Sequence, residues 1–338
     1  MSSSIPSSRA TPGDAHRRKP APRHSGIDLL RVVAIMAVVL GHLPLEPGMR
    51  ATIYGWHVPL FFFLSGWFYR PGRTVEDEVT NRWRTIGRPY VFWLLVIGSV
   101  EVSALLIRDE FSPVALARMA WGGALLVAPF SAFWFMSALF LGAVLYRVLA
   151  DRLTPEAALL VGILAMACAG WVGEPAAKLP LALGQAAMSL VFLYAGHRAA
   201  GITRPGRVTG AAAVAVVISG ACALWTGLVP PLDMKVADMG APIVSVLLAL
   251  VMSWGLTAAA ASLPSLGRGA DSVVTELAAT GTAVIFLHAL FIWGTVRWEV
   301  PTPFAFPIMV VLCWAVALVL ARAPASEWTL GRPRRTRG

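Results

Sequence analysis

The stretch GIDLLRVVAIMAVVLGHLPL, residues 26–45, decides the fold class, because it is a membrane-length apolar segment that also carries Arg31 and His42. The two residues are eleven positions apart. On an α-helix this spacing makes about three turns with an angular offset of only ~20°, so the two side chains lie on one stripe roughly 16 Å apart. An ionisable residue inside a bilayer is costly and is a functional hypothesis by default. Two simpler interpretations stay open: Arg31 extends to the near interface, and His42 caps the far end of the helix.

The whole chain is apolar enough to be a polytopic membrane protein. Hydrophobic residues make up 57% of its 338 residues and charged residues 14%, against about 45 to 50% and about 25% in soluble proteins. Because a transmembrane helix needs about 20 mostly apolar residues, we predict an all-α fold of about ten transmembrane helices. The expected spans are residues 27–45, 52–70, 88–107, 132–150, 156–173, 180–199, 208–229, 241–263, 276–296 and 303–322.

The basic residues predict how these helices are oriented. The net charge is +10, but most of the 28 Lys and Arg residues fall on one side of a ten-span arrangement. By the positive-inside rule, both termini are then cytoplasmic, and this loop pattern argues against a nucleic-acid partner. The apolar segment 111–130 is long enough for an eleventh span, but a crossing there would place most of the later basic residues outside. We therefore expect a re-entrant or interfacial segment.

Composition divides the chain into three regions. Residues 1–25 are rich in Ser, Pro and Arg and are expected to form a disordered basic cytoplasmic tail. Residues 26–323 form the membrane domain, and 324–338 a second basic cytoplasmic tail. No cleavable signal peptide is expected, because the first apolar stretch follows the long tail and carries Arg31 and His42. The three cysteines lie in different spans, so neither a disulfide framework nor a metal site is expected.

The second span, YGWHVPLFFFLSGWFYR (residues 54–70), carries a histidine, His57, near its external end. His57 starts at the external level that His42 reaches on the first span, so the two imidazoles are expected to share a pocket. Trp134 opens the fourth span at the same side. Its ring fits two interpretations, an interfacial aromatic belt and a stacking surface for a sugar.

The cytoplasmic loop after the second span ends in three arginines, Arg82, Arg84 and Arg88. One interpretation is contact with anionic lipids, worth on the order of 1 kcal/mol for each arginine. The other is a clamp for a polyphosphate cofactor such as an acyl-coenzyme A, because guanidinium groups bind phosphate oxygens bidentately. Spacing alone does not choose between them.

Four segments occur in an order that resembles the acyltransferase-3 family of integral membrane O-acyltransferases, and most of all its sugar O-acetylase branch, the fucose-acetylase-like members. They are the Arg31 and His42 pair, WHVPLFFFLSGWF (56–68), NRWRTIGRPYVFW (81–93) and AFWFMSALF (132–140). The resemblance implies transfer of an acyl group, usually acetyl, from cytoplasmic acyl-CoA to a hydroxyl of a glycan, lipid-linked sugar or related acceptor.

The resemblance also assigns residues. The Arg and His of the family motif fall on Arg31 and His42, the aromatic Ser-Gly motif on Phe62, Phe63, Ser65 and Gly66, and the basic motif on the three arginines before the third span. The later histidine falls on His288 in VIFLHALF (284–291). Here the match is weaker, because ELAATGTAVIF (276–286) replaces the Ser and Tyr that usually precede that histidine.

Acyl transfer to an alcohol needs a base for the hydroxyl proton and stabilisation of the oxyanion. His42 suits the base, since an imidazole titrates near pH ~6.5, and Arg31 suits the phosphates or pantetheine carbonyls of the donor, with Asp28 as its counter-ion. We assign Ser65 and the three loop arginines to donor binding, and His57, Trp134 and His288 to the acceptor. The base accepts the hydroxyl proton during direct transfer, or an acyl-histidine intermediate forms.

Two other classes of function remain open. One is a secondary transporter or flippase for sugars or lipids, with Arg31 and His42 on the substrate or proton path. The other is a membrane scaffold or sensor, which leaves their shared face unexplained. The Ala- and Arg-rich composition points to a bacterial source, hence to the cytoplasmic membrane. Expected partners are acetyl-CoA or another acyl-CoA, the acceptor, the bilayer and a second copy of the chain in a homodimer.

Overall fold

The computed structural model describes residues 24–201, 207–297 and 299–334, and its regular elements in these ranges are helices. The predicted N-terminal tail lies outside the described residues, apart from its last two. The first half contains α1 (Ser25–Gly41), α2 (Pro47–Tyr54), α3 (His57–Trp67), α4 (Val75–Arg82), α5 (Arg88–Ile107), α6 (Pro113–Trp121) and α7 (Phe133–Arg152). The second half contains α8 (Pro155–Val172), α9 (Glu174–Ala177), α10 (Leu183–Met188), α11 (Leu190–Ala200), α12 (Arg207–Trp225), α13 (Pro242–Ser262), α14 (Arg268–Arg297), α15 (Thr302–Leu320) and α16 (Ser326–Thr329).

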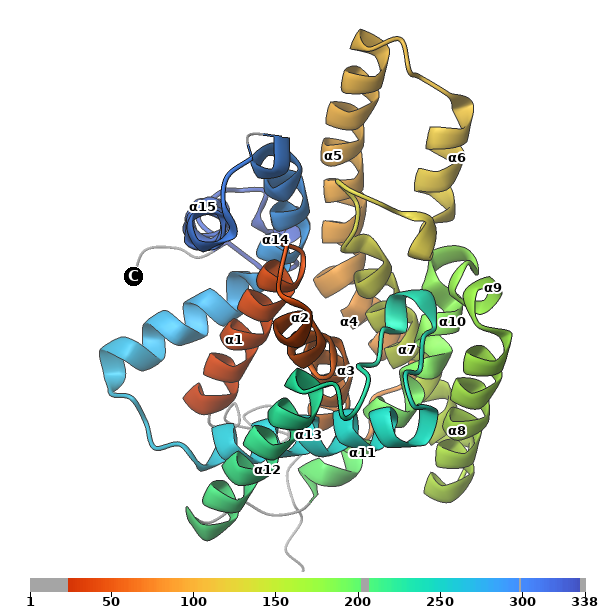
Figure 1. Cartoon of the computed structure of the whole chain (residues 1–338), viewed down its shortest axis with the longest axis vertical. Coiled ribbons are helices and arrows are strands. Elements are labelled where there is room, and N and C mark those ends of the chain that lie inside the picture. The colour runs from red at the N-terminus through yellow and green to blue at the C-terminus, as the bar shows by residue number, and fades with distance from the viewer. Residues whose placement is uncertain (1–23, 202–206, 298, 335–338) are drawn as a thin grey trace, which may run out of the picture.

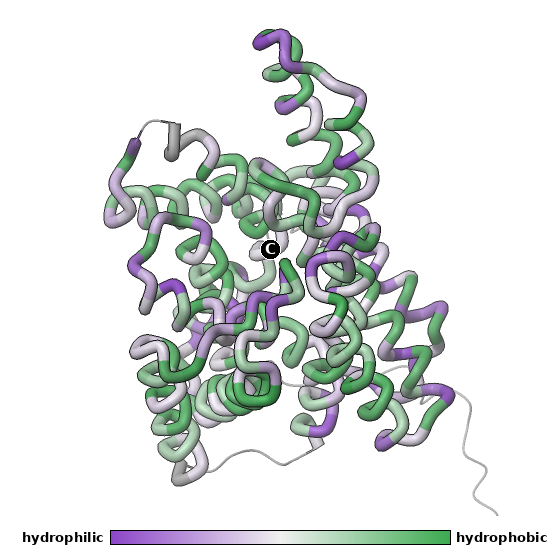
Figure 2. Tube along the Cα trace, turned by 45° about the vertical axis from the view of Figure 1, so that its right-hand side comes forward, coloured by the Kyte–Doolittle hydropathy of each residue, from purple (hydrophilic) through white to green (hydrophobic). Residues whose placement is uncertain are grey.

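Six helices in the described part of the chain are long and apolar enough to cross a membrane. They are Val75–Ile107, Phe133–Arg152, Pro155–Val172, Pro242–Ser262, Arg268–Trp293 and Thr302–Leu320. Figure 2 shows hydrophobic residues along most of the helices and hydrophilic residues concentrated in loops and at helix ends. The chain is a multi-pass membrane protein, while the count of ten spans and the cytoplasmic position of the termini stay predictions.

Two of the expected spans, residues 52–70 and 180–199, depart from a single regular helix in the structure. Residues 52–70 divide between α2 and α3, whereas α10 and α11 continue into each other through Ser189, which has helical backbone angles and helical hydrogen bonds on both sides. The second segment begins irregularly, because Leu181 and Ala182 have φ angles of 52° and 61°, which non-glycine residues rarely adopt. Hydropathy detects the apolar run in each segment, but it does not detect such features.

The third expected span, residues 88–107, is the C-terminal part of a longer helix. Residues Val75–Ile107 form 33 continuous helical residues, with a π-helical turn at Trp83–Gly87 between α4 and α5. In Figure 1, α5 extends beyond the other helices together with α6. The 9 residues of α6 span only about 14 Å, and the helix ends at Gly122 with a φ of 72°. Residues 111–130 therefore do not form an eleventh spanning helix.

Close backbone contact joins α3 to α11. A Cβ atom added to Gly66 would lie 1.9 Å from the carbonyl oxygen of Leu193, and one added to Gly196 would lie 1.9 Å from that of Phe63. Glycines at the crossing let the helix backbones touch, as is common where membrane helices pack. This contact fixes the position of Ser65, which neighbours Gly66 and is half-buried.

The chain after α15 folds back onto α5. The indole nitrogen of Trp93 donates a hydrogen bond of 3.0 Å to the carbonyl of Thr329, and Arg88 pairs with Glu327 at 2.9 Å. The segment expected to be a tail after residue 323 is thus packed against the bundle as far as the structure describes it.

Candidate active site

Three histidines gather where α1, α3 and α14 meet. The rings of His42 and His288 are 4.8 Å apart at an interplanar angle of 71°, and His42 also acts electrostatically on His57. The ring of His57 packs against Tyr54 at 5.2 Å, and the Tyr54 hydroxyl donates to the carbonyl of Gly41 at 3.4 Å. The structure therefore places His288, which is 246 positions after His42, in ring contact with it, while the shared pocket of His42 and His57 stays a prediction.

The same backbone contact orients each of these imidazoles. Nδ1 of His42 lies 2.8 Å from the carbonyl oxygen of Val38, and His57 and His288 make the equivalent contact with the carbonyl four residues earlier, at 2.8 and 3.2 Å. Because a carbonyl oxygen only accepts hydrogen bonds, Nδ1 must carry the proton in each ring. The neutral ring then has its basic lone pair on Nε2.

His288 is the most enclosed of the three. Its side chain is 0% exposed, and its Nε2 atom has no hydrogen-bond partner. Buried polar atoms are almost always hydrogen-bonded, so one that is not needs an explanation. A polar group of a bound ligand would supply the partner.

Arg31 lies in the N-terminal half of α1, apart from the histidines. Its guanidinium pairs with Asp28 at 3.3 Å, and Asp28 also accepts a hydrogen bond of 2.9 Å from Thr275 on α14. The expected counter-ion is thus confirmed. The unbroken helix between residues 31 and 41 keeps the predicted separation of about three turns from His42.

At the other end of α3, Ser65 and Arg82 are in direct contact. The Arg82 Nη2 atom donates to the Ser65 hydroxyl at 2.9 Å, and its Nε atom donates to Glu78 at 2.7 Å. Arg84 is exposed, and Arg88 is paired with Glu327 instead. The three arginines do not converge on one point, because their offsets along the helix and the π-turn between them direct them to different neighbours.

Trp134 occupies the core and not the surface. Its side chain is 5% exposed, and it packs beside Phe135 with the ring centroids 6.2 Å apart. The role of Trp134 in acceptor binding stays a prediction.

A family model described as Acyltransferase domain, Acyl_transf_3, matches residues 24–322, which include all of these histidines and arginines. The chain belongs to the acyltransferase-3 family. Comparison with curated proteins and with solved structures gives no significant match. Membership in an acyltransferase family favours acyl transfer over the transporter, flippase and scaffold alternatives, because each polar cluster then has a chemical role.

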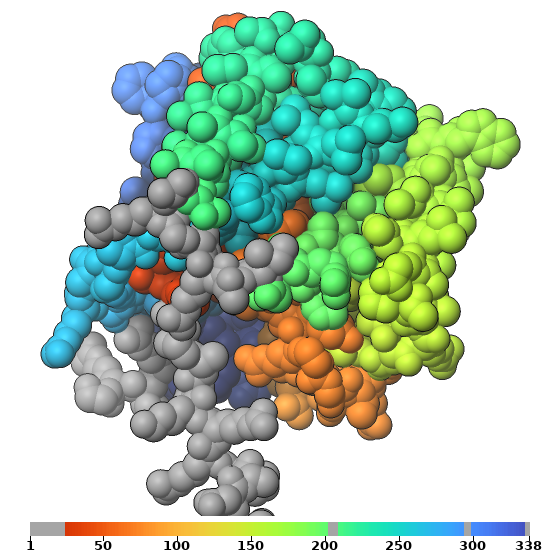
Figure 3. All heavy atoms as spheres, turned by 90° about the horizontal axis from the view of Figure 1, so that it is seen from below, coloured from red at the N-terminus to blue at the C-terminus, as the bar shows by residue number. Residues whose placement is uncertain are grey.

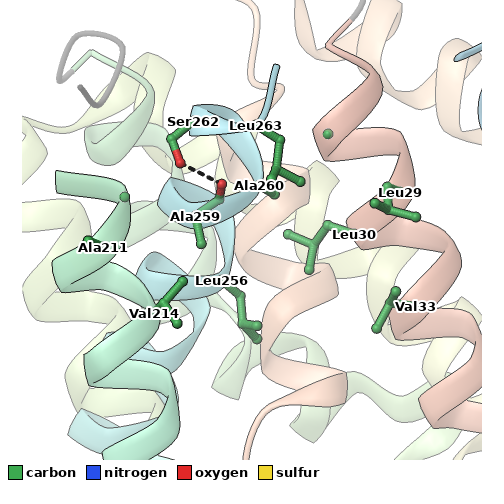
Figure 4. A pocket seen from close by; sticks show the side chains of 12 residues that line it. Leu29, Leu30, Val33, Ala211, Val214, Leu256, Ala259, Ala260, Ser262 and Leu263 are labelled. Atoms are coloured by element: carbon green, nitrogen blue, oxygen red, sulfur yellow. Dashed lines mark hydrogen bonds between the residues drawn. The ribbon is translucent and has the colours of Figure 1, made fainter. Parts of the chain in front are cut away.

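In this acyltransferase, a groove elsewhere in the bundle is chemically inert. It encloses about 410 Å³ between α1, α12 and α13, and Figure 4 shows its aliphatic lining. The Ser262 hydroxyl is used internally, in a hydrogen bond of 2.7 Å to the carbonyl of Ala259. Without an acid, a base or a free polar donor, the groove does not suit acyl transfer.

Two basic residues near His42, Lys235 in the loop before α13 and Arg50 on α2, were given no role in the sequence analysis. Both act electrostatically on His42. The Lys235 Nζ atom donates to the carbonyl of Leu126 at 3.2 Å, and Asp233 accepts from the Lys235 backbone at 3.1 Å. Burial raises the pKa of Asp233 and lowers the pKa of Lys235, as expected where charged groups are removed from water.

Arg147 and Glu78 were also missed. Arg147 is only 1% exposed although it carries a charge, and it lies over the Tyr69 ring at 3.7 Å. In the sequence it is one of many basic residues near span ends, and no local pattern distinguishes it from a marker of topology.

Proposed function

We propose that this member of the family is an O-acyltransferase of the bacterial cytoplasmic membrane. It transfers an acyl group, acetyl in our proposal, from cytoplasmic acyl-CoA to a hydroxyl of a glycan, lipid-linked sugar or related acceptor. The observation that carries the proposal is the fixed tautomer of His42. Its Nδ1 is committed to Val38 at 2.8 Å, so its Nε2 is the nitrogen free to accept a proton.

The proposed reaction uses that nitrogen as a general base. Nε2 of His42 accepts the proton of the acceptor hydroxyl while the hydroxyl oxygen attacks the carbonyl carbon of the thioester. The C–S bond then breaks, and the proton passes to the departing thiolate, so the products are an O-acyl ester and free coenzyme A. Lys235 and Arg50, which act electrostatically on His42, favour the negative charge that develops on the carbonyl oxygen.

The two ends of α3 support a division between donor and acceptor. Ser65 and Arg82, which lie at one end, are assigned to the acyl-CoA. His57 lies at the other end, near His42, and is assigned with His288 to the acceptor. Arg31 is assigned to the phosphates or carbonyls of the donor arm, because a guanidinium group offers several hydrogen-bond donors in a planar arrangement that matches phosphate oxygens.

Replacement of His42 tests the assignment of the base. The purified protein in nanodiscs should release free thiol from acetyl-CoA when an acceptor extract is present. His42→Ala should lower kcat by about 10² to 10⁴-fold, the usual contribution of a general base, without a change in the thermal unfolding temperature. Thiol release measured with a chromogenic disulfide, together with transfer of radiolabelled acetyl, gives the rate.

His24→Ala is the matched control, because His24 is exposed at the start of α1. It should retain full activity. An active His42→Ala variant would remove His42 from the base assignment, whereas a wild-type protein that releases no thiol from any acyl-CoA would overturn the proposed donor.

A further inference from the structure

A buried cation and a buried anion meet where α4 packs against α7. Arg147 on α7 donates from Nη2 to the carbonyl of Arg70 at 2.9 Å and from Nη1 to the hydroxyl of Tyr69. Its Nη2 atom lies 3.8 Å from Glu78 and its Nη1 atom 3.7 Å from Asp151. An ion buried this deeply is costly unless other groups compensate it. A role of the buried pair is therefore to be sought in the groups that surround it.

Glu78 is the common partner of three arginines. Its carboxylate lies 2.7 Å from Arg82, 3.5 Å from Arg73 and 3.8 Å from Arg147. The side chain is only 7% exposed, while those of Arg82 and Arg73 are 18% and 30% exposed. The buried carboxylate therefore holds two partly exposed guanidinium groups on its outer side and one buried guanidinium behind it.

Three guanidinium groups, those of Arg73, Arg82 and Arg147, lie against the carboxylates of Glu78 and Asp151. The exposed carboxylate of Asp77 also interacts electrostatically with Arg73 and Arg147. The cluster also lines a small polar cavity of about 20 Å³ that includes Ser65, which is room for about one water molecule. An anion thus fits at the rim, against the exposed parts of Arg73 and Arg82, and not inside the cavity.

The cluster lies on an accessible face of the molecule. Tyr69 stacks on His197 of α11 at 4.1 Å, so the end of α3 and α11 meet here. In Figure 3 the segment around residues 70–85, in orange, adjoins the end of α11, in green, on the face seen from below.

We propose that Glu78, held from behind by Arg147, is a positioning residue that orients Arg82 and Arg73 to bind a phosphate group of the acyl donor. This inference rests on the proposed use of acyl-CoA. The bond from Arg82 Nε to Glu78 and the bond from Nη2 to Ser65 together fix the plane of the guanidinium. A fixed plane matters because guanidinium recognises phosphate through bidentate, directional bonds.

The test compares steady-state kinetics of Glu78 variants in nanodiscs. Glu78→Gln should raise the KM for acetyl-CoA by about tenfold or more, the usual effect of losing a charge-assisted hydrogen bond, and should leave kcat and the acceptor KM within about twofold. Glu78→Asp, which keeps the charge, should recover part of the donor affinity. Glu76→Gln is the control, because Glu76 is exposed on the same helix and should behave as wild type.

A second variant covers the case in which Glu78→Gln does not fold. Arg73→Gln leaves the contact between Glu78 and Arg147 in place, and it should raise the KM for acetyl-CoA several-fold while its effect on acetyl-pantetheine, which lacks the nucleotide phosphates, stays small. An unchanged donor KM in the folded variants, or an equal loss with both donors, would overturn the positioning role alone. A wild-type protein without acetyl-CoA turnover would overturn the proposed function and this inference with it.

Discussion

At the scale of single residues, the contact of an imidazole with its own helix decides the chemistry of the site. His42, His57 and His288 each use Nδ1 on the carbonyl four residues earlier, so all three present Nε2 to their surroundings. This local contact sets the tautomer without a carboxylate partner. The positive charges of Lys235 and Arg50 act on His42 from outside its own helix.

The loop that carries Lys235 gives a pH-dependent prediction. Burial raises the pKa of Asp233, so the folded state binds this proton more tightly than the unfolded state does. The protonated Asp233 carboxyl therefore stabilises the folded state at pH values below its pKa in the unfolded chain, about 3.9. This stabilisation is lost as the pH rises through the higher pKa that Asp233 has in the folded state. Asp233→Asn should therefore unfold at a higher temperature than wild type at pH 7, and the difference should shrink toward pH 4.

Thermal unfolding in detergent between these two pH values measures the effect. A difference between wild type and Asp233→Asn that stays constant over the range would contradict it.

Some of these residue contacts follow from the sequence and others do not. The pair of Asp28 and Arg31 is predictable, since residues three apart on a helix are neighbours. The contact of His42 with His288 needs the packing of α1 against α14, which no local pattern encodes. Arg147 could not be recognised either, because a buried arginine and a snorkelling one look the same in sequence.

At the scale of elements, the crossing of α3 and α11 places Ser65 beside Arg82. The crossing depends on Gly66, where an added Cβ would lie 1.9 Å from the carbonyl of Leu193. Gly66→Ala should force the helices apart and cost about 1 to 3 kcal/mol, as overpacking does. Its unfolding temperature should fall, and its KM for acetyl-CoA should rise.

Gly269→Ala is the matched control for this substitution. An added Cβ at Gly269 meets no atom within 4 Å, and alanine favours a helix over glycine by about 1 kcal/mol. It should be neutral or stabilising, and an equal unfolding temperature for both variants would contradict the close crossing.

Long apolar elements are predictable and interrupted ones are not. The expected spans at 132–150, 156–173, 241–263 and 303–322 coincide closely with α7, α8, α13 and α15. The expected span 52–70 is divided between α2 and α3, and the expected span 180–199 begins with unusual backbone angles at Leu181 and Ala182. Hydropathy detects neither feature. The motif residues lie on both kinds of element.

At the scale of the whole molecule, polar clusters at opposite ends of α3 face two sides of a multi-pass bundle. His42, His57 and His288 lie at one end, and Ser65, Arg82, Glu78 and Arg147 lie at the other. The prevalence of basic residues in the loops near the second cluster predicts that it is cytoplasmic. The account therefore requires the donor and the acceptor to approach from opposite faces.

The most direct measurement supplies membrane-impermeant radiolabelled acetyl-CoA to sealed vesicles of known orientation. With the cytoplasmic face outward and the donor outside, label should accumulate in the glycan or lipid acceptor fraction, and this should require both the protein and His42. Label that reaches the acceptor only when acetyl-CoA is enclosed in the lumen, or to the same extent with His42→Ala, would contradict the account.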